Sequence, residues 1–230
     1  MSKGVQKIYA EASNTYEMIN HLLTLGLDIL WRKKTSELVS QHRGKKWLDV
    51  CSGTGEMALA LQNIAPPETA VFSADFSLPM LRNGKSKSDS EKIQFSLADA
   101  GNLPFRDDTF DLITISYATR NLNPTKQRLI SYLREFNRVL KPGGHFINLE
   151  TSQPGNRVIR ELYHLYVRLG VRRLGAIISG SRTGYSYLSY TVRNFYDPIE
   201  FAGILKLAGF KDVRVRRLFL GVFAIHQATV

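Results

Sequence analysis

The stretch Trp47-Leu-Asp-Val-Cys-Ser-Gly-Thr-Gly-Glu56 decides the fold of this chain. Its apolar half ends at Cys51 and predicts a short buried strand, whereas the residues from Met57 to Leu61 follow helical spacing. A strand, a glycine turn and a helix in this order are typical of the first unit of a doubly wound α/β sheet. Ligands bind such sheets at the carboxyl ends of the strands. The turn Ser52-Gly-Thr-Gly55 therefore predicts a ligand site.

The remainder of the chain alternates apolar runs with helical patterns, which predicts a Rossmann-like sheet of seven strands. The later strands are expected at Val71–Asp75, Ile93–Asp99, Phe110–Tyr117, His145–Glu150, near Val213–Arg216 and at Gly221–His226. Helices are expected from Leu129 to Leu140 and from Pro198 to Ala208. Because no helical pattern separates the last two strands, we expect them to be antiparallel.

Two nucleotide-like ligands compete for the glycine turn. The spacing Gly53-x-Gly55-x-x-Ala58, with Asp75 about 20 residues on, formally satisfies the dinucleotide fingerprint. A dinucleotide would place its pyrophosphate on the helix N-terminus, where Glu56 stands and would repel it. S-adenosylmethionine has no phosphate and carries cationic ammonium and sulfonium groups, so the acids beside the turn favour that ligand.

Acidic residues follow three successive strands, and we assign each a contact with S-adenosylmethionine. Asp49 lies at the end of the first strand beside the glycine turn. Asp75 ends the second strand and is expected to accept hydrogen bonds from the ribose hydroxyls. Asp99 ends the third strand and is expected to accept from the adenine amino group, with Ala100 beside it.

Composition and charge exclude several classes of protein. The 230 residues are 43% hydrophobic and 22% charged, as in an ordinary globular protein, and the single cysteine excludes a disulfide framework. No segment has the roughly 18 uninterrupted apolar residues of a membrane span. We therefore expect a cytoplasmic protein. The net charge of +11 predicts an anionic partner surface, either nucleic acid or a membrane, although a basic protein without such a partner is an alternative.

We expect one domain with four parts. Residues 1–45 form a helical lid with an apolar stripe, 46–151 a cofactor-binding core, 152–196 a helical insert over the acceptor site, and 197–230 the last helix and strands. The insert interleaves arginines with aliphatic and aromatic residues. Such a basic amphipathic helix suits peripheral binding to an anionic membrane, whereas packing over the sheet is the alternative. A homodimer is left open.

The chain resembles the class I S-adenosylmethionine methyltransferases and, within them, the ubiquinone/menaquinone biosynthesis C-methyltransferases (UbiE/MenG type). The glycine turn is common to the superfamily, whereas the family is indicated by other segments along nearly the whole chain. These are Tyr16-Glu-Met-Ile-Asn20 through Trp31, Ser116-Tyr-Ala-Thr-Arg-Asn121, Arg138-Val-Leu-Lys-Pro-Gly-Gly144, Leu149-Glu150, Tyr185-Ser-Tyr-Leu188 and Val222-Phe-Ala-Ile-His226. The chain departs from the family pattern at Glu17, Asp28 and Arg182-Thr-Gly184, all on the acceptor side.

The resemblance implies methylation of a ring carbon of a prenylated quinol, either demethylmenaquinol or a ubiquinol precursor. Arg120 cannot act as a base, so we assign it to stabilising the quinolate, with a water taking the proton. Asn121 and Tyr16 are expected to orient the quinol oxygens. The donor is assigned to Asp49, Ser52, Gly53, Thr54, Gly55, Asp75, Phe76, Asp99, Ala100, Ser116 and Tyr117. No metal is implied.

Three other functions are weighed against this one. The first keeps the donor but methylates another small molecule on oxygen, nitrogen or carbon. The second is nucleic-acid methylation, which is disfavoured because Tyr117-Ala-Thr-Arg120 lacks the required Pro-Pro-aromatic turn and Cys51 lies in the cofactor turn. The third is a non-catalytic binding module, which would fail to bind the methyl donor. His164 and His226 are candidate bases, although packing or surface roles fit them better.

Overall fold

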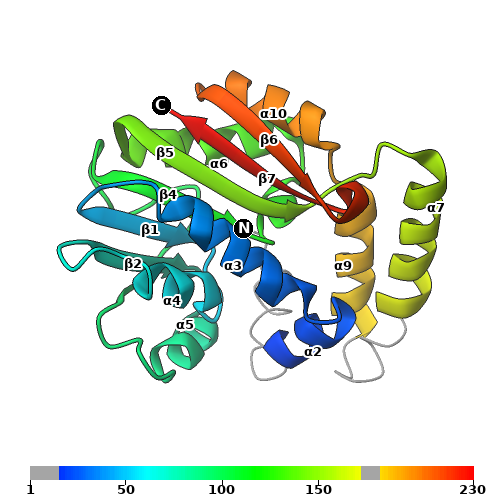
Figure 1. The fold of residues 1–230 in the computed structure, drawn as a ribbon, viewed down its shortest axis with the longest axis horizontal. Helices are drawn as coiled ribbons and strands as arrows, with labels where there is room; N and C mark the ends of the chain where they lie inside the picture. The colour runs from blue at the N-terminus through cyan, green and yellow to red at the C-terminus, as the bar shows by residue number, and fades with distance from the viewer. Residues whose placement is uncertain (1–15, 172–181) are drawn as a thin grey trace.

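The computed structural model of the chain describes residues 16–171 and 182–230. They form one seven-stranded sheet with helices on both faces (Figure 1), in the order β3-β2-β1-β4-β5-β7-β6. The strands are β1 (Lys46–Val50), β2 (Ala70–Asp75), β3 (Gln94–Leu97), β4 (Phe110–Ser116), β5 (Leu140–Thr151), β6 (Lys211–Leu218) and β7 (Phe223–Thr229). Strands β1 to β5 pair in parallel, and β7 is antiparallel to both β5 and β6. The doubly wound sheet with an antiparallel last strand is thereby confirmed.

The order of the strands places the ligand site. The chain runs outward from β1 through β2 to β3 and then returns, so that β4 pairs with the other edge of β1. Such a reversal leaves a crevice at the carboxyl ends of the two central strands. Here those ends are Val50 and Ser116, and the glycine turn begins directly after the first of them.

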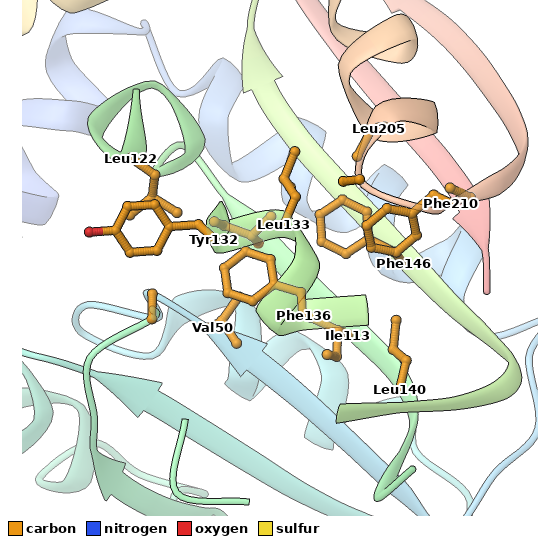
Figure 2. Close-up of a cluster of buried hydrophobic side chains, with 14 of the residues drawn as sticks. Val50, Ile113, Leu122, Tyr132, Leu133, Phe136, Leu140, Phe146, Leu205 and Phe210 are labelled. Atoms are coloured by element: carbon orange, nitrogen blue, oxygen red, sulfur yellow. The ribbon is translucent and has the colours of Figure 1, made fainter. Parts of the chain in front are cut away.

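The helices cover the two faces of the sheet through side chains that alternate along each strand. Their bounds are α2 (Tyr16–Leu23), α3 (Leu27–Val39), α4 (Glu56–Gln62), α5 (Leu78–Lys85), α6 (Lys126–Val139), α7 (Arg157–Tyr166), α9 (Arg182–Arg193) and α10 (Pro198–Leu207). In β4, Leu112 packs in the cluster with α3 and α4, whereas Ile113 packs in the cluster with α6 and α10. This alternation is the period of two that a strand imposes. Figure 2 shows the second cluster, in which Phe136 and Phe146 stack.

Local signals explain where the last helix begins. Pro198 occupies the first turn of α10, and the side chain of Asp197 accepts hydrogen bonds from the backbone N–H groups of Ile199 and Glu200. The Glu200 carboxylate in turn accepts from the N–H of Asp197. This capping box satisfies backbone N–H groups that the first turn of a helix leaves unpaired. The chain can therefore pass directly from the extended residue Asp197 into α10.

Several expected elements differ in extent, among them β5, which begins at Leu140 rather than at His145. The N-terminal helical stretch is two helices, because Leu25 (φ 54°) and Gly26 (φ 76°) adopt left-handed backbone between them. Strand β3 ends at Leu97, two residues before Asp99. The insert is not one helix: α7 continues into the short π-turn η2 (Val167–Val171), and α9 follows after residues 172–181, which lie outside the described part. Among the described residues, none of the helices is long and apolar enough to cross a bilayer.

Candidate active site

A polar cavity opens at the carboxyl ends of β1, β2 and β4. It is lined by Arg32, Asp49, Cys51, Ser52, Gly53, Thr54, Glu56, Met57, Asp75, Phe76, Met80, Ser116, Tyr117, Ala118 and Asn121. Most of the residues expected to bind the methyl donor are therefore brought together in one place. Gly55, Asp99 and Ala100 are the expected donor residues that do not line it.

The glycine turn keeps its backbone accessible from the cavity. Gly53 has φ 56° and Gly55 has φ 75°, a conformation that L side chains rarely adopt. A Cβ atom at Gly53 would meet no other atom within 4 Å, so open space lies over this residue. Gly55 precedes α4 as its N-cap. Gly53 is therefore the point at which a ligand has room to approach the main chain, whereas Gly55 serves the turn itself.

Two buried carboxylates stand at the floor of this cavity. Asp49 accepts a hydrogen bond from the Thr114 hydroxyl (2.7 Å), and burial raises the pKa of Asp49 to about 7. Asp75 accepts from the backbone N–H groups of Gly53 (2.9 Å) and Ser77 (2.8 Å), and burial raises its pKa to about 6. A cationic ligand, or one whose hydroxyl groups donate hydrogen bonds, would stabilise the ionised form of both acids.

Two hydroxyl groups at the end of β4 complete the polar lining. The side-chain oxygens of Ser116 and Tyr117 are buried, and neither has a hydrogen-bond partner among the described residues. Tyr117 also has left-handed backbone (φ 57°), which turns the chain sharply after the strand. Buried hydroxyls without partners are uncommon, so this pair provides polar groups that a bound molecule would satisfy. The chemistry of this polar lining thus suits a cationic ligand such as the predicted donor.

Asp99 and Ala100 occupy different surroundings from those expected. Asp99 is exposed beyond the end of β3, and its carboxylate accepts from the N–H of Gly101 (2.8 Å). Ala100 is buried in the hydrophobic cluster that contains α6. The proposed contacts of these two residues with adenine stay predictions.

Arg32 is a site residue that sequence reasoning missed. Its guanidinium group lies between two carboxylates, 2.7 Å from Asp28 and 3.0 Å from Glu56, and its carbon is 5.1 Å from the ring centre of Tyr117. His21 contacts the same two carboxylates, at 2.8 Å from Asp28 and 3.4 Å from Glu56. His21, Asp28 and Glu56 are grouped closely enough to ligate a metal ion, but the Arg32 cation already lies against both acids.

The position of Arg32 changes the reading of Glu56. Glu56 lines the polar cavity, as expected for an acid that favours a cationic ligand, and its carboxylate is in addition paired with Arg32. Burial raises the pKa of Glu56, and Arg32 partly offsets that rise. The spacing of Asp28 and Arg32, four residues apart on one helix, was the available signal.

A second cavity of about 450 Å³ adjoins the first and is apolar. Arg32 and Tyr117 line both cavities, so the two meet at these side chains. Most of the walls of the second cavity are aliphatic or aromatic side chains from the N-terminal helices, α7, η2, α9 and the β6–β7 turn. These are Leu23, Leu25, Leu27, Ile159, Leu162, Tyr163, Tyr166, Val167, Val171, Leu188, Val192, Phe219, Leu220, Val222 and Phe223. Its size and lining suit a long apolar chain rather than a polar metabolite.

Arg120 lines the apolar cavity beside this junction. It lies in the 3-10 turn η1 (Thr119–Leu122) directly after β4, and its side chain is buried. Its Nη1 atom donates to Glu150 Oε1 (2.6 Å) and to the backbone carbonyl of Tyr117. Glu150 also accepts from the backbone N–H groups of Arg120 (3.2 Å) and Thr151 (2.7 Å). The guanidinium group is therefore held in one orientation by a buried acid from β5, whose role the sequence did not reveal.

The other expected catalytic residues are placed as follows. Asn121 is buried and lines the polar cavity, whereas Arg120 lines the apolar one. Tyr16 is the first residue of α2, and its side chain lies outside the described part. His226 is buried on β7 and bonds the Pro198 carbonyl (2.9 Å), and His164 contacts Gln153 (2.7 Å). Neither histidine lines either cavity, which agrees with packing roles.

The sheet and the acid-lined glycine turn define an S-adenosylmethionine-dependent methyltransferase of the Rossmann-like class. The chain belongs to the ubiE/COQ5 methyltransferase family, whose model matches residues 1–230. It is 36% identical to the demethylmenaquinone methyltransferase of Staphylococcus carnosus, over 96% of this chain and 91% of that protein. The enzyme of the same name from Staphylococcus aureus is equally similar.

Solved structures agree in fold. The crystal structure of a SAM-dependent methyltransferase from Thermotoga maritima superposes with a TM-score of 0.70 at 16% identity, covering 98% of this chain and 99% of that chain. A SAM-dependent methyltransferase from Aquifex aeolicus gives 0.60 at 17% identity, covering 85% and 89%. These two likenesses bear on the fold alone.

Proposed function

We propose that this enzyme methylates a ring carbon of a prenylated quinol, with demethylmenaquinol as the first choice and a ubiquinol precursor as the second. The observation that carries the proposal is the meeting of an acid-lined polar cavity with an apolar cavity at Arg32 and Tyr117. A polar donor and an apolar acceptor would face each other there. The names of the relatives from Staphylococcus support the choice of acceptor.

S-adenosylmethionine, bound in the polar cavity, would supply an electrophilic methyl group. Asp75 would accept hydrogen bonds from the ribose hydroxyls. It also accepts a hydrogen bond from the N–H of Gly53, and this bond holds the glycine turn in place. Asp49 would face the positive end of the donor. Ser52, Thr54 and Phe76 line the same space, and Ser116 and Tyr117 bring their buried hydroxyls to it. Gly55, Asp99 and Ala100 keep their assignment to this site.

The acceptor ring would lie between Tyr117 and Arg120, with its tail in the apolar cavity. A quinol becomes nucleophilic at carbon when a neighbouring hydroxyl ionises, and the positive charge of Arg120 would stabilise that oxyanion. The hydroxyl proton would leave to water first. The ring carbon would then take the methyl group that the donor supplies, the donor keeping its sulfur as a neutral thioether, and the ring proton would leave to water. Arginine keeps its proton, so Arg120 acts by charge and orientation. Asn121 and Tyr16 would orient the quinol oxygens.

We also propose that the protein works at a membrane surface with residues 1–45 as a lid, of which residues 1–15 lie outside the described part. An isoprenoid tail partitions into lipid, and the net charge of +11 favours an anionic bilayer. The lid is supported by the contacts of α2 with the helices that flank the polar cavity: Glu17 pairs with Lys87 next to α5, and His21 lies 3.4 Å from Glu56 at the start of α4.

The proposal is tested with methyl-labelled S-adenosylmethionine and membranes that contain demethylmenaquinol or a ubiquinol precursor. We expect label in the quinone fraction. Label that stays out of every quinone fraction and enters another metabolite would reject the proposed acceptor and favour the alternative, a methyltransferase for a different small molecule.

A further inference from the structure

The apolar cavity has a hydrophobic mouth. Four side chains that line it are also largely exposed: Leu25 (83%), Leu162 (63%), Phe219 (52%) and Leu220 (70%). A residue that both lines a cavity and faces solvent marks its opening. We call these four residues the apolar rim. They come from the α2–α3 turn, from α7, and from the β6–β7 turn η3 (Phe219–Gly221).

Three rim residues have backbone conformations that are unfavourable for large side chains. Leu25 has φ 54°, Phe219 φ 43° and Leu220 φ 56°, all in the left-handed region where glycine is the usual residue. Exposed apolar side chains at such positions contribute little to the hydrophobic core. Strained backbone at exposed positions is typical of segments that serve a function. The chain therefore carries large apolar groups at two loop tips where glycine would be easier to accommodate.

The helix beside the mouth extends the same apolar surface. Helix α7 has no buried residue, and Val158 and Leu165 are exposed in addition to Leu162. Figure 1 shows α7 at the edge of the molecule, next to α9 and the β6–β7 turn. An amphipathic helix whose apolar residues stay in water is typical of helices that lie on a bilayer.

The charges around the mouth have one predominant sign. Helix α7 and η2 carry Arg157, Arg160 and Arg168 against a single acid, Glu161. Strand β6 leads into the rim and exposes Arg214, Arg216 and Arg217, whereas Lys211 and Asp212 lie at its other end. If the rim enters a bilayer, arginine side chains beside it would reach the lipid phosphate groups while the neighbouring aliphatic groups enter the acyl region. This is the charge complement of an anionic lipid surface.

We propose that the apolar rim inserts into the surface of an anionic lipid bilayer, with the arginines of α7 and β6 on the headgroups. The mouth of the cavity then opens into the acyl layer, and a prenyl tail enters without crossing water. The inference rests on the proposed work at a membrane surface and names the residues that would make that contact, whereas it does not depend on which acceptor is methylated. The partner is the bilayer itself: its acyl layer takes up the apolar rim, and its anionic headgroups bind the arginines.

Sedimentation of the full chain with lipid vesicles tests this inference without any quinol. We expect binding to phosphatidylcholine vesicles that contain phosphatidylglycerol, and at least tenfold weaker binding to phosphatidylcholine alone. Val158→Asp combined with Leu165→Asp, both outside the cavity lining, should weaken binding to the mixed vesicles at least tenfold and leave the calorimetric affinity for S-adenosylmethionine unchanged. Ile199→Asp, an equally exposed apolar position on α10, is the matched control and should bind like the unmodified chain.

Leu220→Gly separates docking from folding. This change relieves the left-handed backbone, so the melting temperature should stay the same or rise while vesicle binding falls. Vesicle binding that is unchanged in Leu220→Gly and in the α7 double variant would overturn the inference, even for an enzyme that methylates quinols. Rim-dependent vesicle binding by a protein that methylates no quinol would support the docking surface and reject only the proposed function.

Discussion

Arg120 Nη1 lies 2.6 Å from Glu150 Oε1, and both side chains are buried where β4 and β5 end beside the junction of the two cavities. A buried guanidinium group needs a counter-charge, because desolvation of a lone charge is expensive. Glu150 provides that charge and additionally bonds the backbone of η1. The acid therefore determines both where Arg120 points and whether η1 keeps its position.

Removing the acid should destabilise the fold. Glu150→Ala leaves the Arg120 charge buried without its partner, and we expect a loss of about 3–5 kcal/mol in the free energy of unfolding. Glu150→Gln keeps an acceptor for Arg120 and Thr151 and should lose less. Urea unfolding measures both variants. A loss below about 1 kcal/mol for Glu150→Ala would show that the pair contributes little to stability.

Arg120→Lys should separate charge from orientation. Lysine keeps the positive charge, but its single nitrogen would have to replace Nη1, which bonds both Glu150 and the Tyr117 carbonyl, so no second nitrogen would be left to hold the oxyanion. We expect the rate of methyl transfer to fall by about 10²-fold with the affinity for S-adenosylmethionine unchanged. Arg106→Lys, the same change at an exposed arginine, is the control and should be neutral. Near-normal turnover in Arg120→Lys would argue against a role for guanidinium geometry.

Asp75→Asn should weaken binding of the methyl donor. The amide keeps an oxygen for one backbone N–H but loses the charge that favours hydrogen bonds from ribose hydroxyls. We expect a loss of about 1.5–3 kcal/mol in binding, roughly tenfold to 150-fold in Kd, by calorimetry. Asp89→Asn, at an exposed position, is the control. The same experiment with Asp99→Asn tests the assignment of that residue to adenine, since an unchanged Kd would remove it from the site.

The stability of the ligand-free protein should depend on pH through two acids. Burial raises the pKa of Asp49 to about 7 and of Asp75 to about 6, from a usual value of 3.8. The folded chain then holds protons that the unfolded chain releases, so this contribution to stability is present at low pH and is lost as pH rises through 6 and 7.

The stabilisation that the donor provides should increase with pH, because the donor binds the ionised forms of Asp49 and Asp75. The rise in melting temperature on adding S-adenosylmethionine should therefore be larger at about pH 8 than at about pH 5. Scanning calorimetry at the two pH values, with and without donor, measures the effect. Asp49→Asn should reduce it. An equal donor-induced shift at both pH values would mean that neither acid changes its ionisation on binding.

Enlarging a side chain in the apolar cavity should discriminate between acceptors by tail length. Val192 lines this cavity from α9 and is buried. We expect Val192→Phe to raise the KM for a long-tailed quinol about tenfold or more, because it takes up tail space. The KM for a tail-less quinol should stay unchanged. Ile199→Phe is the matched enlargement at an exposed site. Equal effects on both acceptors would place the tail elsewhere.

The central sheet and the polar cavity of the site can be predicted from local sequence patterns. Short apolar runs locate the central strands, and the glycine turn with Asp49 and Asp75 locates the polar cavity. Carboxyl ends of parallel strands always meet at one edge, so these predictions need no knowledge of tertiary contacts. Arg120 is singled out by the resemblance to the family, and it lies in η1, the turn that follows β4.

The remaining features depend on contacts between distant segments. Glu150 reads as the end of a strand, and only the pairing of β4 with β5 brings it to Arg120. Arg32 belongs to a helix that packs across α4, which is how it reaches Glu56. Leu25 and Gly26 break the N-terminal helical stretch with left-handed backbone. Gly26 is the signal that the sequence offered, whereas leucine seldom adopts this conformation.

The most direct test of the central claim uses purified protein, S-adenosylmethionine with a deuterated methyl group, and short-tailed demethylmenaquinol. We predict that the donor is consumed in equal amount to the quinol and that mass spectrometry and NMR place the deuterated methyl group on a ring carbon. Deuterated methyl on oxygen, or a protein that leaves the quinol unchanged while it methylates another acceptor, would contradict the account.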